Sequence, residues 1–268
     1  MKNKVIINKY LKELGIDFEI KTLEDITKLI QKHEEKLSFS SVKVLLKDEI
    51  SLELKDIFES LVINKRGGYC FEHNKLMYEA LKELGFDVQF FLARVVNNSN
   101  NEVPQTHRFT MLNFKGNKYL VDVGVGFRSP TVPVKFGNVT TNGNLGISYR
   151  IKEYKELRKY GLELIQDNKS FIVTEFNLNP CYEVDFELGH FYSHKHKDAV
   201  FLNNLVVSSI LKDEIRSLRN SDYFKISKDK KEIIKVDNLG EFSRILKEDM
   251  NLILSKEEIS YLFKSFIE

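Results

Sequence analysis

The hydrophobic pattern changes sharply near Gly85, and this change constrains the fold more than any other feature of the sequence. Before Gly85, apolar residues recur at the spacing of amphipathic helices. After it, short runs rich in β-branched and aromatic residues follow one another as far as residue 176. Helices that precede strands, instead of alternating with them, predict an α+β fold rather than a doubly wound parallel sheet.

Helices are predicted in several places before that boundary. The first ends at Gly15, and Thr22 begins the second with a capping box. Ser51 is expected to open a further helix. Another follows Cys70 and ends at Gly85, since glycine is the usual residue after a helix C-terminus.

The predicted strands share β-branched and aromatic residues between polar turns, and they occupy residues 88–96, 106–114, 118–125, 147–152, 161–166 and 170–176. Gly116-Asn117 is the expected hairpin turn between the second and third of them. The last third is mixed. It contains a small hairpin over 222–226 and 232–236 and two helices over 239–249 and 256–267, while residues 202–211 are ambiguous.

Composition excludes several classes of protein. The 268 residues are 42% hydrophobic, enough for a large core, and the net charge is only +2. Basic and acidic residues are interspersed, so neither nucleic acid nor a membrane surface is an expected partner. No apolar run is long enough to span a bilayer, and no signal peptide is recognised. With two cysteines only, reduced thiols and a cytoplasmic location are expected, while no pattern indicates an oligomeric state.

The stretch Arg-Gly-Gly-Tyr-Cys-Phe-Glu-His-Asn, residues 66–74, points to thiol chemistry. Cys70 falls where a helix begins, and the unpaired N–H groups and dipole there favour a thiolate and could receive an oxyanion. Gly67 and Gly68 let the chain turn and are expected to leave room above the sulfur. A free cysteine is more often a small buried apolar residue, and Cys181, which lacks this setting, is interpreted in that way.

His107 and Asp122 are the candidate partners of the thiol. His107 begins an apolar strand, where a histidine is more often structural than catalytic. Asp122 also lies in an apolar strand, where a carboxylate is costly unless it is paired. A histidine N–H is the natural partner, and that bond would fix the tautomer and support an imidazolium.

The expected hairpin presents a difficulty for this pair. With the turn at Gly116-Asn117, Asp122 lies opposite Met111, which is four residues from His107. At about 3.3 Å per residue, the two backbones would be about 13 Å apart. A direct bond therefore requires a bulge, a strong twist or a different pairing.

The other polar residues near the motif are interpreted as structural. Arg66 and Glu72 are expected to form an ion pair that holds the loop. His33 lies in a charged helical run and is expected to be solvated. His73, about one helical turn after Cys70, should point along the helix and away from the open side of the thiol.

Together these residues resemble the arylamine N-acetyltransferase family. Its pattern Arg-Gly-Gly-x-Cys-x-Glu-x-Asn is complete, its histidine matches His107, and its Val-Asp-x-Gly motif matches residues 121–124. The resemblance implies an N-terminal helical domain (1–86), a central β-barrel domain (87–195) and a C-terminal α/β lid domain (196–268). The first two would share the catalytic core of cysteine proteases and transglutaminases.

The resemblance also implies acetyl transfer by a ping-pong mechanism. Cys70 would take the acetyl group from acetyl-CoA, the acyl donor, and an arylamine, arylhydroxylamine or arylhydrazine would then attack the acetyl-enzyme. His107 would carry the proton and Asp122 would orient His107. No metal is implied.

Further site residues follow from the resemblance alone. Thr106, Val125, Phe127 and Ser129 correspond to positions that line the acceptor pocket, although an aromatic is usual where Val125 stands. Ser38-Phe39-Ser40-Ser41 replaces the Pro-Phe-Glu-Asn of the family.

The expected CoA contacts lie on two segments. Val103, Pro104 and Tyr192 correspond to positions that contact CoA. Lys195 and Lys197 could meet its phosphates by charge, although a solvated loop explains them equally well.

Two other classes share these residues. A thiol hydrolase or an amide-forming enzyme, either transglutaminase-like or macrocyclising, has the same Cys, His, Asp order, whereas papain-type proteases place the histidine much further downstream. A non-catalytic binding module on the same fold would need no activated Cys70.

Overall fold

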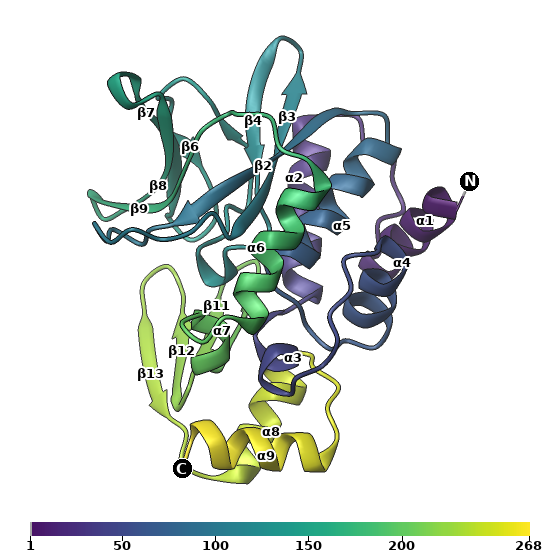
Figure 1. Cartoon of the computed structure of the whole chain (residues 1–268), viewed down its shortest axis with the longest axis vertical. Helices are drawn as coiled ribbons and strands as arrows, with labels where there is room; N and C mark the ends of the chain where they lie inside the picture. The colour runs from purple at the N-terminus through teal and green to yellow at the C-terminus, as the bar shows by residue number, and fades with distance from the viewer. Residues whose placement is uncertain (1) are drawn as a thin grey trace.

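The chain has three parts, which Figure 1 shows around a common centre in a computed structural model that describes residues 2–268. Helices gather on one side, a strongly curved sheet lies beside them, and a smaller sheet with two helices lies below. Met1, the first residue of the N-terminal stretch in which no signal peptide is recognised, is outside the described residues. The predicted α+β class is confirmed.

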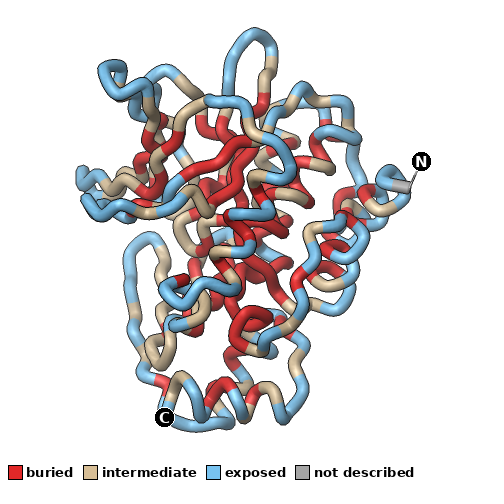
Figure 2. The backbone as a smooth tube through the Cα atoms, in the orientation of Figure 1, coloured by how far each residue is buried: buried red, intermediate tan, exposed pale blue. Residues whose placement is uncertain are grey.

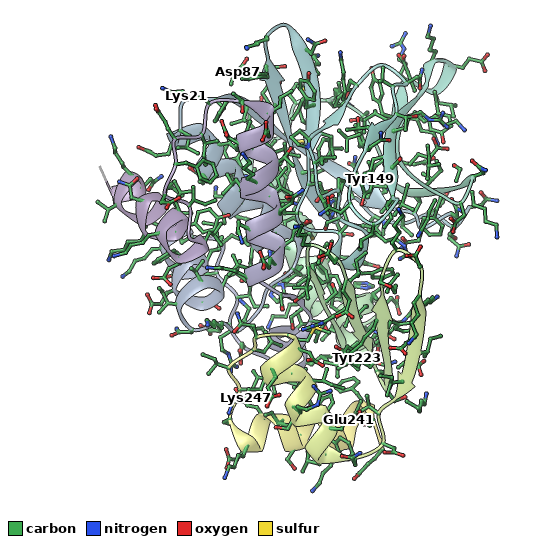
Figure 3. The ribbon with its side chains drawn as sticks, turned by 180° about the vertical axis from the view of Figure 1, so that it is seen from behind. Lys21, Asp87, Tyr149, Tyr223, Glu241 and Lys247 are labelled. Atoms are coloured by element: carbon green, nitrogen blue, oxygen red, sulfur yellow. The ribbon has the colours of Figure 1, made fainter. Side chains whose placement is uncertain are left out.

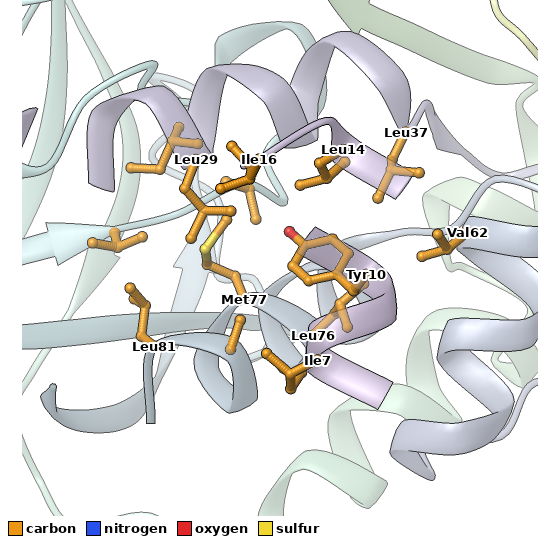
Figure 4. Close-up of a cluster of buried hydrophobic side chains, with 14 of the residues drawn as sticks. Ile7, Tyr10, Leu14, Ile16, Leu29, Leu37, Val62, Leu76, Met77 and Leu81 are labelled. Carbon is orange, nitrogen blue, oxygen red and sulfur yellow. The ribbon is translucent and has the colours of Figure 1, made fainter. Parts of the chain in front are cut away.

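The helices of the first part, apart from the short one that begins at Val42, pack around one core. They are α1 (Lys2–Leu14), α2 (Leu23–Lys36), α3 (Val42–Leu45), α4 (Leu54–Ile57) with its π-helical continuation η1 (Phe58–Ile63), and α5 (Cys70–Glu83). Tyr10, Leu29 and Met77 come from three of these helices and meet in the cluster of Figure 4. Leu112 and Val121 of the curved sheet belong to the same cluster, so the helices and that sheet share a core.

Most of the predicted helix boundaries agree with these elements, but the helix expected at Ser51 begins later. The Ser51 hydroxyl accepts a hydrogen bond from the Glu53 N–H at 3.1 Å and donates one to Asp56 at 2.7 Å. These bonds make a polar turn, so α4 starts at Leu54. The capping box predicted at Thr22 is present.

His33 is fully buried, so the prediction that it is solvated was wrong. Its Nδ1 lies 2.7 Å from the Tyr10 hydroxyl, and its Nε2 lies 2.7 Å from Nδ1 of His73. The Nε2 of His73 is 3.3 Å from the Ser38 carbonyl, which only accepts. Each ring therefore donates from Nε2, and Tyr10 donates to His33. Burial lowers the pKa of both rings, to about 4 for His73, so the chain of bonds is neutral.

The curved sheet contains β2 (Asp87–Val95), β3 (His107–Phe114), β4 (Asn117–Val121), β5 (Val134–Lys135), β6 (Thr141–Asn142), β7 (Ser148–Tyr154), β8 (Lys159–Gln166) and β9 (Lys169–Phe176). The strands are antiparallel in the order β5-β4-β3-β2-β9-β8-β7-β6. Because β5 at one edge contacts β7 near the other, the sheet nearly closes into a barrel. Strands β5 and β6 were not predicted, because a strand of two residues is too short to show an alternating hydrophobic pattern.

The hairpin between β3 and β4 turns one residue earlier than expected. Phe114 pairs with Asn117, so Lys115 and Gly116 form the two-residue turn, with φ angles of 48° and 76°. Positive φ at both positions is the type I′ geometry that suits a two-residue hairpin. The resulting register brings Asp122, just beyond the last pair, opposite Phe109, only two residues from His107. This pairing removes the 13 Å difficulty.

The third part is a sheet in the order β1-β10-β11-β12-β13 with helices against it. Its elements are β1 (Phe39–Ser40), β10 (Val206–Ile210), β11 (Ile215–Arg219), β12 (Asp222–Ile226), β13 (Lys231–Lys235), α8 (Leu239–Arg244) with η4 (Ile245–Asp249), and α9 (Lys256–Phe266). In Figure 3 the label of Tyr223 lies between this sheet and the C-terminal helices, and the Tyr223 hydroxyl donates to Asp249 at 2.9 Å. The ambiguous residues 202–211 contain the end of α7 (Val200–Asn203) and all of β10.

The three parts are joined by segments that cross between them. Helix α6 (Glu183–Lys195) runs in front of the molecule from the barrel toward the smaller sheet (Figure 1). The short strand β1 comes from the first part and pairs with β10. Figure 2 shows that the buried backbone concentrates in the centre, where the three parts meet. The boundaries at residues 86 and 195 stay predictions.

Candidate active site

Cys70 is the first residue of α5, as the sequence predicts, and its side chain is buried at 3% exposure. Tyr69 before it is extended, and Gly67 has a φ of 69°, so the chain enters the helix through a sharp turn. The Cys70 thiol donates to the Thr106 carbonyl at 3.5 Å. The nucleophile candidate therefore lies at the positive end of a helix, against the segment that leads into β3.

His107 and Asp122 are in direct contact. The Nε2–H of His107 donates to Oδ2 of Asp122 at 2.6 Å, and both side chains are 1% exposed. This bond leaves Nδ1 of the ring for Cys70. Burial lowers the pKa of His107, but the charge and hydrogen bond of Asp122, together with those of Cys70, outweigh it and raise the pKa to about 10.

Asn74 holds the three groups together, a role that the sequence reasoning missed. It lies one helical turn after Cys70, on the same face of α5. Its side-chain NH₂ donates to Asp122 at 2.8 Å and to the Arg108 carbonyl, and its oxygen accepts from the Val123 N–H at 2.9 Å. Asn74 thus ties the nucleophile helix to the ends of β3 and β4.

The glycine that packs closely against Cys70 is Gly124, because Gly67 and Gly68 face other groups. A Cβ on Gly67 would meet Ser40, and one on Gly68 would meet Glu72, whereas one on Gly124 would lie 2.8 Å from Cys70 Cα. The expectation that the glycine pair leaves room above the sulfur was therefore wrong.

Gly124→Ala is expected to destabilise the fold by about 1–3 kcal/mol, because overpacking forces its neighbours to shift. The added Cβ would lie 2.5 Å from the Asn74 amide nitrogen, so acetylation activity should fall as well. Urea unfolding and initial rates measure the two effects. Gly240→Ala is the control, since only Asn238 lies near, at 3.6 Å. Equal stability of the two variants would contradict the close approach.

Glu72 pairs with Lys43 of α3, so the predicted ion pair with Arg66 was wrong. The Lys43 ammonium contacts one carboxylate oxygen of Glu72, and the other accepts from the Tyr69 N–H at 3.3 Å. Arg66 turns away and binds Asp48 and Glu258, the latter through both guanidinium nitrogens. Lys43 therefore neutralises a buried carboxylate in the first turn of the Cys70 helix.

Lys43→Met is expected to cost about 3–5 kcal/mol of unfolding free energy, because it leaves the Glu72 charge buried without a partner. Glu72→Gln in the same chain should restore most of the loss. The exposed pair of Lys32 with Glu35 gives the control, Lys32→Met, with an expected effect below about 1 kcal/mol. Denaturant unfolding is measured for the wild type, the two single variants, the double variant and Lys32→Met, and additive effects of Lys43→Met and Glu72→Gln would exclude the pairing.

Aromatic rings pack in the same cluster as Cys70, and two of them were not predicted. Phe201 lies 5.4 Å from the Tyr69 ring and 5.8 Å from the Phe39 ring, measured between centroids. Phe39 also packs on Gly126, where a Cβ would approach its ring to 3.2 Å. No local pattern marks these rings, since each comes from a different part of the chain.

The predicted acceptor residues are placed in different settings. Thr106 is half-buried beside Cys70 through its carbonyl. The buried Ser129 hydroxyl accepts from the Val125 N–H at 2.9 Å, so it braces the turn that carries half-buried Val125. The Phe127 ring packs under Arg128 at 4.3 Å and faces a cleft of about 630 Å³ between the barrel and the smaller sheet.

The predicted CoA residues also fall into two groups. Val103 and Pro104 belong to the segment before β3, which lies against α6 and reaches Cys70 through Thr106. Tyr192 is half-buried and stacks on His196 with 4.4 Å between ring centroids. Lys195 and Lys197 are exposed. Nothing in the geometry joins these lysines to the thiol.

Within residues 2–268, no helix is both long and apolar enough to cross a bilayer. Over the same range, no group of three His, Cys, Asp or Glu side chains is placed to hold a metal ion.

Comparison with known proteins places this site in a class. The family model described as N-acetyltransferase matches residues 22–259, nearly the whole chain. By class, therefore, the chain belongs to the N-acetyltransferase family.

Individual relatives narrow the assignment. A relative from Escherichia coli named arylamine N-acetyltransferase is 30% identical over 192 residues, which cover 71% of this chain and 68% of the relative. The chain therefore belongs to the arylamine N-acetyltransferase family and is an acyltransferase.

Solved structures agree with that assignment. The arylamine N-acetyltransferase from M. tuberculosis superposes with a TM-score of 0.90 at 25% identity, covering 98% of this chain and 100% of that one. The Mycobacterium marinum enzyme in complex with CoA superposes at 0.91 with 22% identity and the same coverage, which supports the fold. The resemblance drawn from residues 66–74 is confirmed.

Proposed function

We propose that this protein transfers an acetyl group from acetyl-CoA to an arylamine, arylhydroxylamine or arylhydrazine through an acetyl-Cys70 intermediate. The observation that carries the proposal is the buried contact of His107 with Asp122 beside the Cys70 thiol. A thiol next to an imidazole that a carboxylate orients is an arrangement for nucleophilic catalysis. The name of the relatives supports the acceptor class, and the CoA complex of the M. marinum enzyme supports the donor.

The reactive form in this proposal is a thiolate and imidazolium pair, which forms when the Cys70 proton leaves the Thr106 carbonyl for Nδ1 of His107. With a pKa of about 10, His107 carries its second proton at neutral pH. Asp122 stabilises the charge on the ring from the Nε2 side, and the helix N-terminus stabilises negative charge on the sulfur. Once formed, the pair needs no further proton transfer before attack on a thioester.

In the first half-reaction the Cys70 sulfur attacks the acetyl carbonyl carbon of acetyl-CoA. The carbonyl oxygen becomes an oxyanion, which N–H groups at the start of α5 would receive. When the intermediate collapses, the C–S bond to CoA breaks, and the leaving sulfur takes the Nδ1 proton of His107. Acetyl-Cys70 and neutral His107 remain.

In the second half-reaction the acceptor nitrogen attacks the acetyl-Cys70 carbonyl. Neutral His107 removes the proton from the attacking nitrogen at Nδ1, while Asp122 holds Nε2–H. The C–S bond to Cys70 then breaks and restores the thiolate and imidazolium pair. No net proton is consumed in the full cycle.

The acceptor would enter beside Thr106 and the turn that carries Val125, Phe127 and Ser129. Valine at position 125 leaves more room there than an aromatic residue would. The acceptor is therefore expected to be packed against the Phe39 and Phe201 rings instead.

The CoA contacts proposed for Val103, Pro104, Tyr192, Lys195 and Lys197 can be tested directly. The double substitution Lys195→Ala, Lys197→Ala should raise the KM for acetyl-CoA with little change in kcat. An unchanged KM would reject a role for these two lysines.

A test with two stages separates acetyl transfer from the related thiol chemistries. Protein is mixed with acetyl-CoA, excess CoA is removed, and the acetyl-enzyme is followed by intact mass in buffer and with a panel of aromatic amines and hydrazines. Transfer predicts a slow loss of the acetyl group in water and a fast loss with an acceptor, which appears acetylated. Fast loss in water would indicate a thiol hydrolase. A protein that is never acetylated, and whose Cys70 reacts with iodoacetamide no faster than a free thiol, would be a binding module.

A further inference from the structure

A second carboxyl group is buried behind the active-site turn, and the proposed mechanism does not use it. Glu34, near the end of α2, is 5% exposed, and neither carboxyl oxygen has a hydrogen-bond partner in the protein. The Ser208 hydroxyl on β10 is 2% exposed and also without a partner. Buried polar groups are seldom left unpaired, so two of them together require an explanation.

Both side chains line the same small cavity. Its other walls include Phe39 of β1, His73 of α5 and Ser129 in the turn after β4, so all three parts of the fold meet there. Gly126 opens the space, since a Cβ at that position would lie 3.2 Å from the Ser208 oxygen. The volume open to the centre of a water molecule is about 10 Å³. That volume is the size of one water site.

The surroundings of Glu34 favour its neutral form. Burial and the charge of Asp122 raise its pKa well above the ordinary value, and the nearby Ser129 hydroxyl offsets this only in part. The charged or titratable groups that face it from the packed elements are Asp122, His73 and Tyr149. The surface pocket on its outer side also contains Lys28, Lys32, Glu35 and Lys212. Tyr149, labelled in Figure 3, donates to the Ser129 carbonyl at 3.0 Å.

We propose that Glu34, as a carboxylic acid, and Ser208 bind one internal water molecule that joins α2 to β10 behind the turn after β4. A protonated carboxyl group offers one donor and an acceptor, a hydroxyl offers both, and a water needs two to four such partners. The bridge supports the turn by filling the cavity that Gly126 and Ser129 line, while Tyr149 holds the turn from the barrel through the Ser129 carbonyl. The turn follows directly from Asp122, so Glu34 and Ser208 are positioning residues.

The charge of Glu34 is expected to affect the proposed reaction. This expected effect on acetylation is the only part of the inference that rests on the proposed function. A second anion near Asp122 would repel the carboxylate that orients His107. Glu34 therefore has to stay uncharged while Asp122 is ionised. Acetylation of Cys70 should fall at alkaline pH when Glu34 ionises, and Glu34→Gln, which stays neutral, should keep its rate to higher pH.

The water bridge is tested without activity. A crystal structure should contain an ordered water within about 3.2 Å of both Glu34 and the Ser208 oxygen. In a double-mutant cycle of Glu34→Leu and Ser208→Ala, the shifts in unfolding midpoint should be non-additive, although the two side chains form no direct bond. Additive shifts, or density without a water, would overturn the bridge.

The protonation state is tested by infrared spectroscopy. At pH 7 the carbonyl band of a protonated carboxylic acid should be present in the wild-type protein, absent in Glu34→Gln, and kept in Glu35→Gln, whose exposed carboxylate is the matched control. The alkaline limb of the acetylation rate should shift upward in Glu34→Gln alone. If the band remains in Glu34→Gln as well as in Glu35→Gln, the proposal that Glu34 is a neutral carboxylic acid is overturned. If the wild-type protein is never acetylated, the proposed function is rejected. The water and infrared results would still test whether Glu34 and Ser208 bind a water molecule.

Discussion

Cys70→Ala should remove acetyl transfer almost completely, lowering kcat by about 10⁴- to 10⁶-fold, as loss of a nucleophile does in other covalent enzymes. The alanine variant retains the helix N-terminus and the contact of His107 with Asp122, so its fold should remain close to that of the wild-type protein. Intact mass after mixing with acetyl-CoA should give one added acetyl group for the wild type and none for the variant. Peptide mapping should place that group on Cys70.

Cys181→Ala is the matched control, because Cys181 is the other cysteine and is half-buried without a histidine partner. It should be acetylated at the wild-type rate. If the acetyl group instead appeared on Cys181, or if Cys70→Ala turned over acetyl-CoA with an aromatic amine, the assignment of the nucleophile would be wrong.

The parts of the site that the sequence could predict depend on local patterns or on one strong energetic rule. The start of α5 at Cys70 follows from the helical period and the glycine pair before it. The contact of Asp122 with His107 follows from the cost of an unpaired carboxylate in an apolar strand. Both are statements about a residue and its immediate neighbours.

The register of the hairpin could not be fixed from the sequence with the same certainty. A choice between Gly116-Asn117 and Lys115-Gly116 changes the turn by one residue but the pairing partner of Asp122 by two, from Met111 to Phe109. Lysine with φ of 48° is an uncommon choice at a turn, and glycine normally carries that position. The twist of the barrel selects the type I′ turn that local composition does not predict.

The parts that were missed depend on contacts between distant segments. Lys43 looks like a surface residue in the sequence, yet it is buried because it lies against Glu72, 29 positions away. His33 likewise lies in a charged run and is buried by Tyr10 and His73. In each case a polar residue is stabilised inside the protein by a partner that only the assembled fold supplies.

Asp122→Asn should lower kcat by about 10⁴-fold, the loss found when the orienting carboxylate of a catalytic histidine becomes an amide. An asparagine can still accept from Asn74 and the Gly124 N–H, which now bind Oδ1 of Asp122 at 2.8 and 3.0 Å. Its NH₂ group would then face Nε2 of His107 and force the proton to Nδ1, the nitrogen that must accept from the acceptor amine. The KM for acetyl-CoA should change little, because Asp122 is buried away from the surface.

The same substitution should change how the thiol responds to pH. In the wild type the pKa of His107 is raised to about 10, so the imidazolium persists below that value and alkylation of Cys70 by iodoacetamide should remain fast at pH 6 to 7. Without the charge of Asp122, burial lowers the pKa of His107, the imidazolium is lost, and alkylation in that range should slow. Asp87→Asn is the control, an exposed aspartate that also accepts from an asparagine side chain, at 3.0 Å. An Asp122→Asn variant with more than about one-tenth of the wild-type kcat would mean that His107 is oriented by other groups and that Asp122 has no part in the proton transfer.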